Sequence, residues 1–298
     1  MKVTGFSFLK NAVLYEYPVV EAIRSILPIC DEFVIAIGKC DDGSLDLIQS
    51  MEEDKIKIIE TEWDENLKKG GRVLAEETNK AFKHISKDTD WAFYIQADEV
   101  IHEKYLDTIS HAMRTYKDNP NVDGLLFKYL HFYGSFDYVG ASSNWYTHEI
   151  RVIKNNPSFY SYKDAQGFRK DDDKKLNVVP IDACVYHYGW VRKPDAMLRK
   201  QNNFGTLYRG NESKGTLVAS GEFDYEGHVR EIRPFQESHP KVMQERIKSQ
   251  NWVFKYDISM SKKNTKDFIK YLLKKYLGWD TNYRNYRIVS QRKRHVQN

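Results

Sequence analysis

Two adjacent carboxylates, Asp98 and Glu99, follow the apolar run WAFYIQA over residues 91–97. A buried strand that delivers acidic side chains at its carboxyl end is how open α/β sheets build ligand sites. Paired acids at such an edge bind a hard divalent cation or transfer protons. A strand that ends in a polar turn would give the same pattern, so the choice depends on the elements that position the two acids.

Strand and helix patterns alternate through the first hundred residues. Strands are expected at 2–9, 32–37, 55–60 and 91–96, and helices at 17–27, 45–51 and 72–85. This alternation predicts right-handed crossovers and a parallel sheet, and hence the α/β class. The loops at 9–11, 38–44 and 97–99 should then converge at one edge of the sheet. This convergence would place four acids around a single crevice: Asp41, Asp42, Asp98 and Glu99.

The pattern becomes less regular after residue 100. Further strands are expected at 122–131, 149–154 and 184–190, and helices at 103–116, from about 194, at 241–256 and at 265–277. The last helix has an apolar face and a lysine-rich face. Such a helix lies on an anionic membrane or docks onto the preceding domain.

Composition favours a soluble globular protein, with 41% hydrophobic and 30% charged residues in 298. The three cysteines are odd in number and lack metal-ligand spacing, so we expect unpaired thiols in a reducing compartment. No apolar run is long enough to span a bilayer, and the first residues lack a signal-peptide pattern. We therefore expect a cytoplasmic protein, either free or peripheral at the inner membrane face.

Charge is distributed unevenly along the chain. The whole chain carries a net charge of +4, but residues 237–298 hold 15 Lys or Arg against 5 Asp or Glu. The preceding body is therefore net acidic. A nucleic-acid-binding protein would show a basic face across its folded body, so we expect no nucleic-acid partner.

Four segments in this order resemble a family-2-like glycosyltransferase of the GT-A fold: VTGFSFLKN, FVIAIGKCDDGSLD, WAFYIQADEV and ACVYHYGWVRKP. The resemblance covers roughly residues 1–200. It implies a Rossmann-like GT-A domain at 1–235, with a mixed sheet flanked by helices, followed by a basic helical extension at 236–298. In that family an acidic DxD motif holds a divalent metal against the diphosphate of a nucleotide-sugar.

The resemblance also implies roles for individual residues. Asp98 occupies the third position of the DxD motif, whereas Gln96 replaces its first carboxylate. Asp98 and His187 are the expected ligands of Mn²⁺ or Mg²⁺, although a lone histidine in an aromatic stretch is more often a core residue. The residues expected to bind the nucleotide-sugar are Lys10, Asn11, Asp41, Asp42, Arg72, Gln96, Ala97, Asp98 and Arg192.

A catalytic base is harder to find, because no clear Glu-Asp pair stands where the family places one. Glu149 and Asp164 are the candidates, with Glu149 ranked first, and a structural salt bridge is the alternative for either. Four aromatic residues could form an acceptor platform, since sugar faces stack on aromatic rings. They are Phe132, Trp145, Tyr146 and Trp190.

These features predict a metal-assisted glycosyltransferase that moves a sugar from a nucleotide-diphosphate donor. Its acceptor would be a saccharide or another hydroxyl compound, including a lipid-linked one reached through the basic C-terminal region. A nucleotidyltransferase is the alternative enzyme, but it would want a glycine-rich phosphate loop, and SFLKNAV contains no glycine. A non-catalytic relative that binds sugar or nucleotide is the third possibility.

Overall fold

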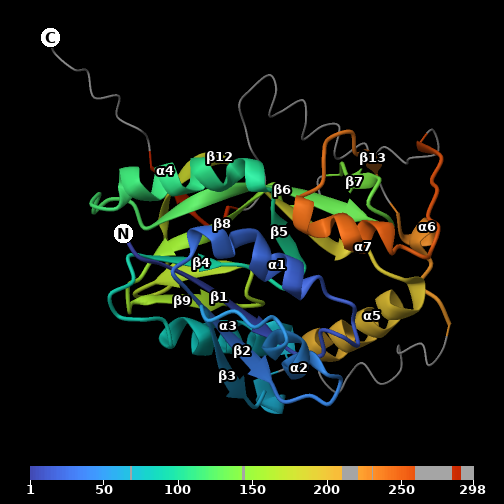
Figure 1. The fold of residues 1–298 in the computed structure, drawn as a ribbon, viewed down its shortest axis with the longest axis horizontal. Helices are drawn as coiled ribbons and strands as arrows, with labels where there is room; N and C mark the ends of the chain where they lie inside the picture. The colour runs from blue at the N-terminus through green and yellow to red at the C-terminus, as the bar shows by residue number, and fades with distance from the viewer. Residues whose placement is uncertain (68, 143–144, 210–220, 230, 259–283, 290–298) are drawn as a thin grey trace, which may run out of the picture.

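A single large mixed sheet forms the centre of the computed structural model (Figure 1). The structure describes residues 1–67, 69–142, 145–209, 221–229, 231–258 and 284–289.

The first half of the chain builds the parallel part of this sheet. Four strands lie in the order β3-β2-β1-β4, and each neighbouring pair is parallel. The expected alternation is confirmed by these elements: β1 (Val3–Leu9), α1 (Val19–Ile26), β2 (Glu32–Gly38), α2 (Ser44–Gln49), β3 (Ile56–Thr61), α3 (Arg72–Lys83) and β4 (Trp91–Tyr94).

The second half continues the sheet with strands of both directions. β8 pairs antiparallel with β4, β6 pairs antiparallel with β8, and β12 pairs parallel with β6. The α/β class with a mixed sheet is therefore confirmed. The bounds are β5 (Glu99–Ile101), α4 (Leu106–Tyr116), β6 (Gly124–Tyr133), β7 (Tyr138–Gly140), β8 (His148–Lys154), β12 (Asn177–Trp190), α5 (Pro194–Arg209), α6 (Tyr225–His228), β13 (Ile232–Pro234), α7 (Gln244–Lys248) and β14 (Arg287–Ile288).

Both faces of the sheet are covered by helices. Successive residues of a strand point to opposite faces, and β2 follows this rule. Phe33, Ile35 and Ile37 pack into one cluster with residues of α1 and α4, whereas Val34 and Ala36 pack into another with residues of α3. This double burial explains why the strand sequences read as continuous apolar runs.

Several strands escaped the sequence analysis because they are short or irregular. A separate three-stranded sheet contains β9 (Phe159–Tyr162), β10 (Gly167–Lys170) and β11 (Lys174–Lys175). The strand expected at 184–190 is the end of β12, which begins at Asn177. The expected strand at 91–96 ends at Tyr94, and the chain then turns through residues 95–98 into β5.

The helix expected at 241–256 is wrong in its second half. A short 3-10 turn (Lys241–Met243) and α7 end at Lys248, and no helix follows up to residue 257. Trp252, Phe254 and Tyr256 alternate inward instead, while Val253 is 82% exposed. This period of two is that of an extended chain rather than a helix.

The segment after residue 235 lies against the body. Met243 packs with Phe132 and Tyr186, and Arg246 forms an ion pair with Glu21 of α1 at 2.8 Å. The expected helix at 265–277 lies outside the described residues. The boundary at 235 between a glycosyltransferase domain and an extension stays a prediction.

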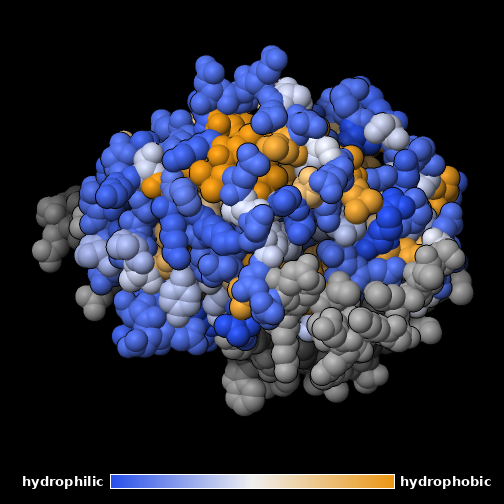
Figure 2. Space-filling view, turned by 90° about the horizontal axis from the view of Figure 1, so that it is seen from below, coloured by the Kyte–Doolittle hydropathy of each residue, from blue (hydrophilic) through white to orange (hydrophobic). Residues whose placement is uncertain are grey.

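The surface seen from below is mostly hydrophilic; its largest hydrophobic area lies above the centre of the view, and smaller ones lie toward the right (Figure 2). β3 is an edge strand of the sheet, and its exposed residues Lys57 and Glu60 are charged, as is usual for an edge strand.

Within the described part of the chain, no helix has both the length and the apolar character to cross a membrane.

Candidate active site

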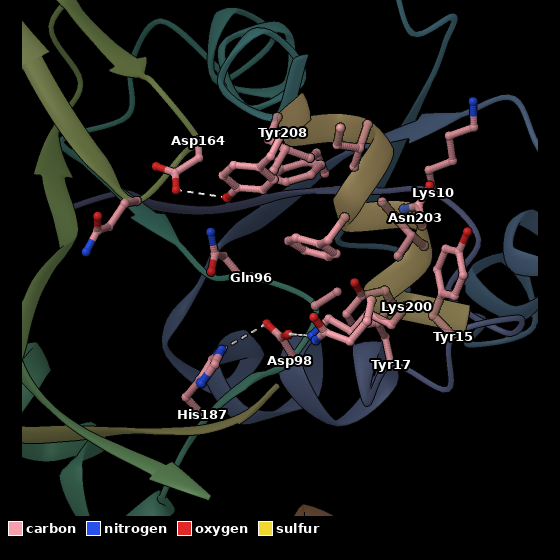
Figure 3. A pocket seen from close by; sticks show the side chains of 18 of the residues that line it. Lys10, Tyr15, Tyr17, Gln96, Asp98, Asp164, His187, Lys200, Asn203 and Tyr208 are labelled. Carbon is pink, nitrogen blue, oxygen red and sulfur yellow. Dashed lines mark hydrogen bonds and ion pairs between the residues drawn. The ribbon is translucent and has the colours of Figure 1, made fainter. Parts of the chain in front are cut away.

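A cavity of about 400 Å³ opens where β1 and β4 end, and α5 forms one of its walls (Figure 3). The carboxyl ends of parallel strands are the expected place for a ligand site in such a sheet. Its lining is Phe8, Leu9, Lys10, Tyr15, Tyr17, Trp63, Leu74, Gln96, Ala97, Asp98, Tyr146, Asp164, Gln166, His187, Trp190, Lys200, Gln201, Asn203, Phe204, Leu207 and Tyr208.

Backbone pairing brings Asp98 and His187 together on one side of this cavity. The Tyr188 N–H donates to the Asp98 carbonyl at 2.7 Å, and β5 continues from there antiparallel to β12, with Glu99 opposite His187. His187 Nε2 lies 3.7 Å from Asp98 Oδ1. The two residues expected to bind a metal are therefore neighbours, although 89 positions separate them in the chain.

Lys200 of α5 holds the other oxygen of the same carboxylate. Its Nζ lies 3.1 Å from Asp98 Oδ2, and both residues are buried, at 6% and 8% exposure. Burial alone would raise the pKa of Asp98, but Lys200, the neighbouring His187 and Arg192 hold it well below the usual range. Burial and the Arg192 charge lower the pKa of Lys200 to about 8, against the effect of Asp98. The pair is ionised at neutral pH.

A chain of hydrogen bonds fixes the tautomer of His187. His131 Nε2 lies 2.8 Å from the Tyr146 carbonyl, which accepts only, so this nitrogen carries the proton. His131 Nδ1 must then accept from His187 Nδ1 at 3.0 Å. Burial lowers the pKa of His187 to about 4, so the ring is neutral. His187 Nε2 therefore presents a lone pair beside Asp98.

This donor set fits a divalent cation. A carboxylate oxygen and an imidazole lone pair lie side by side, and a cation that keeps several waters needs few protein ligands. No group of three His, Cys, Asp or Glu side chains gathers within the described ranges. A cation bound beside Asp98 and His187 would therefore have these two side chains as its ligands among residues of these types. The remaining positions would be left to a ligand such as a diphosphate.

Three other expected donor-binding residues line the same cavity: Lys10, Gln96 and Ala97. Gln96 Nε2 donates to the Tyr94 hydroxyl at 3.2 Å and to the Ala165 carbonyl at 3.3 Å. The Gln96 amide is thus held by Tyr94 and Ala165. In the DxD motif that this segment resembles, a carboxylate occupies the same position. Lys10 lies with its Nζ 5.2 Å from the centre of the Trp63 ring, and Ala97 adds a small side chain beside Asp98.

Five of the expected donor-binding residues do not line the cavity: Asn11, Asp41, Asp42, Arg72 and Arg192. Asp42 accepts from the N–H groups of Leu14 (2.9 Å) and Ser44 (3.1 Å), so it ties two turns together. Asp41 and Arg72 are exposed, and Asn11 adopts a positive φ of 55° in its turn. The expected convergence of loops at the cavity therefore holds for residues 9–10 and 96–98. The turn at 38–44 does not reach the cavity and is bonded to the turn at 12–14 instead.

Arg192 is buried rather than free to bind phosphate oxygens. Its NH1 donates to the Tyr15 carbonyl at 2.6 Å and its NH2 to the Gly189 carbonyl at 3.2 Å. Its Nε has no hydrogen-bond partner among the residues that the structure describes, and the guanidinium lies 4.7 Å from the Tyr17 ring centre. Arg192 therefore contributes charge to the site from behind the wall.

Glu99 is a structural anchor rather than a ligand-binding acid. Both of its oxygens are bound by Arg151, at 2.7 and 2.6 Å, and it also accepts from the Tyr129 hydroxyl at 2.8 Å. The Gln96 N–H donates to the same carboxylate at 3.1 Å. These bonds fix the turn at 96–99 that presents Asp98.

The two candidate bases occupy different places. Asp164 lines the cavity and accepts from the Tyr208 hydroxyl at 2.9 Å. Glu149 is 3% exposed, and Gln166 donates to its Oε1 at 2.9 Å. Its Oε2 has no hydrogen-bond partner in the described part of the chain. Burial raises the pKa of Glu149 to about 8, so it holds a proton at neutral pH.

The sequence analysis did not single out the residues that α5 contributes. Lys200, Phe204 and Tyr208 follow each other at a spacing of four on the cavity side of this helix. The sequence signal for this helix was Lys200, a lysine within an otherwise apolar stripe that includes Ala196, Met197 and Leu207. Of the four expected platform aromatics, Tyr146 and Trp190 line the cavity, whereas Phe132 is fully buried in a core cluster.

No protein-family model matches this chain, and no curated protein does. Solved structures do match. TarS from S. aureus in complex with UDP is 14% identical, with 70% of this chain and 65% of that chain covered and a TM-score of 0.41. The chain covers 39% of a longer TarS structure.

Two further structures are similar over shorter stretches. Glucosyl-3-phosphoglycerate synthase from Mycobacterium tuberculosis, in complex with Mn²⁺, UDP and glucosyl-3-phosphoglycerate, is 14% identical over 44% of each chain, with a TM-score of 0.30. A 4-diphosphocytidyl-2C-methyl-D-erythritol synthase from Anaerococcus prevotii is 9% identical over 52% of this chain and 70% of that one, with a TM-score of 0.32. The solved structures similar to this chain thus include glycosyltransferases and a 4-diphosphocytidyl-2C-methyl-D-erythritol synthase. At these values the likeness assigns no residue a role.

Proposed function

We propose that this chain is a glycosyltransferase that uses a nucleoside-diphosphate sugar. One observation carries the proposal: the ionised Asp98 and the lone pair of neutral His187 lie side by side in a cavity at the carboxyl ends of β1 and β4. Carboxylate and imidazole together suit the binding of a cation-neutralised diphosphate. The surrounding aromatic rings, among them Tyr146 and Trp190, suit the faces of a sugar.

In the proposed reaction, the bond between the anomeric carbon and a diphosphate oxygen breaks, and its electron pair stays on that oxygen. The oxygen of the acceptor hydroxyl forms the new bond to the anomeric carbon, and its proton passes to a base. Asp98 and His187 would hold Mn²⁺ or Mg²⁺, whose positive charge stabilises the diphosphate leaving group. Asp164 is the base that reaches the cavity, which reverses the order expected from the sequence.

The finer expectations stay predictions. They concern a saccharide or lipid-linked acceptor, a cytoplasmic location and a contact with the inner membrane face. The basic helix at 265–277 that would make this contact lies outside the described residues.

A thermal-shift screen with UDP-, GDP-, dTDP- and CMP-sugars, with and without Mn²⁺, tests the proposal. A bound donor stabilises the fold by mass action, by about 2.7 kcal/mol at a concentration of 100 Kd. We expect a shift with at least one diphosphate donor, followed by release of nucleoside diphosphate when an acceptor is present. Release of pyrophosphate from a nucleoside triphosphate would favour a nucleotidyltransferase, and binding without turnover a non-catalytic relative. No shift with any donor would refute the proposal.

A further inference from the structure

Lys200 is a buried cation on the wall of the cavity. Its Nζ donates to Asp98 Oδ2 at 3.1 Å and to the Gly189 carbonyl at 2.8 Å. An ammonium group has three N–H donors. Among the described residues these two acceptors are its hydrogen-bond partners, so one donor is left for a group inside the cavity.

Two aromatic rings restrict the position of this ammonium group. Nζ lies 5.1 Å from the ring centre of Tyr17 and 5.3 Å from that of Phe204, within the range of cation–π attraction. Both rings also line the cavity, as Lys200 itself does. The lysine is therefore held in place before any ligand arrives.

The buried charges around Asp98 do not cancel. Lys200 and Arg192 supply two cations at 6% and 1% exposure, whereas Asp98 supplies one carboxylate. Arg192 donates to backbone carbonyls and forms no ion pair within the described part of the structure. This end of the cavity is thus positive by one charge, and an uncompensated buried charge favours a ligand of opposite sign.

We propose that Lys200 is a diphosphate-binding residue, and that its ammonium group gives the protein a nucleoside-diphosphate affinity which persists without a divalent metal. This inference rests on the proposed function. Lys200 would donate its remaining N–H to a phosphate oxygen while Asp98 keeps the ammonium in position. The metal at Asp98 and His187 would then add to an affinity that the chain already has.

Calorimetric titration with UDP, GDP and dTDP, each in EDTA and in Mn²⁺, tests this role on the full chain. In EDTA, wild-type protein should bind at least one of the three. Lys200→Met should weaken that binding about tenfold or more, because one charge-assisted hydrogen bond contributes at least that factor. Lys200→Arg should retain part of it. The matching nucleoside should bind equally to all these proteins.

Asp98→Asn distinguishes the roles of the two partners. If Lys200 binds the diphosphate, Asp98→Asn should bind it in EDTA at least as tightly as wild type, because the ammonium then has no competing carboxylate. Lys200→Met alone leaves a buried carboxylate unpaired, and this variant could fail to fold. The double variant Lys200→Met with Asp98→Asn removes both charges and should fold, yet bind poorly in EDTA.

Lys193→Met is the matched control. Lys193 immediately precedes α5, pairs with Glu16 at 3.6 Å and does not line this cavity. Lys193→Met should leave the nucleoside-diphosphate affinity in EDTA unchanged.

The inference is overturned if Lys200→Met or the double variant binds in EDTA as wild type does, or if wild type binds only with Mn²⁺. If wild type binds only with Mn²⁺, the proposed glycosyltransferase function still stands. Absence of binding both in EDTA and in Mn²⁺ would refute the role of Lys200 and the proposed function together.

Discussion

Arg151 holds both carboxylate oxygens of Glu99, with Nε 2.7 Å from Oε2 and NH2 2.6 Å from Oε1. Both side chains are buried, at 1% exposure or less, and the guanidinium lies between the rings of Tyr94 and Tyr129. The pair links β8 to the turn that carries Asp98. It belongs to the framework of the site rather than to its ligand-binding surface.

Replacing one partner of this pair should destabilise the fold strongly. Glu99→Gln leaves the Arg151 charge buried and uncompensated, which typically costs about 3–5 kcal/mol. Urea unfolding should show a corresponding drop in the free energy of unfolding. Asp182→Asn, which breaks an exposed pair with Lys128, should leave the unfolding curve unchanged. Equal stability of Glu99→Gln and wild type would mean that the buried pair does not hold the turn.

Glu149 should make stability depend on pH. Burial raises its folded-state pKa to about 8 from an ordinary value of 4.5, so the folded state keeps a proton that the unfolded chain releases. Stability should therefore fall as pH rises from about 4.5 to about 8, by at most about 1.4 kcal/mol per unit, and stay level above that range. Glu149→Gln should remove this fall. Unfolding curves at several pH values measure it, and a constant difference between the two proteins would contradict the assignment.

His187 should govern the response to metal and leave metal-free binding unchanged. His187→Ala removes the imidazole lone pair beside Asp98, so Mn²⁺ should no longer tighten nucleoside-diphosphate binding. The affinity in EDTA should stay at the wild-type value. Titrations with increasing Mn²⁺ measure this, and His111→Ala, an exposed position on α4, is the control. A full Mn²⁺ response in His187→Ala would exclude His187 as a ligand.

Asp164 and Glu149 can be separated by kinetics. Asp164→Asn should lower the rate of sugar transfer about 100-fold or more and leave donor affinity unchanged, as expected for a general base. Glu149→Gln should keep most of the transfer activity, because Gln166 separates Glu149 from the cavity. Tyr208→Phe removes the hydrogen bond to Asp164 and should shift the pH profile of the rate. The reverse ranking of the two acids would assign the base to Glu149.

Much of the fold could be predicted from the sequence because its strands are buried on both faces. Continuous apolar runs such as FVIAIG at 33–38 leave little ambiguity, and the following turns carry polar residues. The same reasoning failed for residues 249–257. An aromatic at every second position there is the mark of an extended segment, and the prediction read it as helix.

The site was predictable only where it depends on strand ends. Asp98 and Lys10 follow β4 and β1, so a parallel sheet places them together. The pairing of His187 with Asp98 needed the resemblance, since it depends on β12 lying beside β5. Lys200 was missed because helix packing, which a single sequence does not reveal, decides which face of α5 meets the cavity.

β12 and α5 are joined by residues 191–193 alone. His187 and Gly189 near the end of the strand, and Lys200, Phe204 and Tyr208 on the helix, therefore belong to one uninterrupted stretch of 187–208. His187 and Lys200, which contact the two oxygens of Asp98, are thus encoded together. Exchanging this stretch between related chains would change this part of the lining in one step, while residues at 8–98 and 146–166 continued to supply the rest.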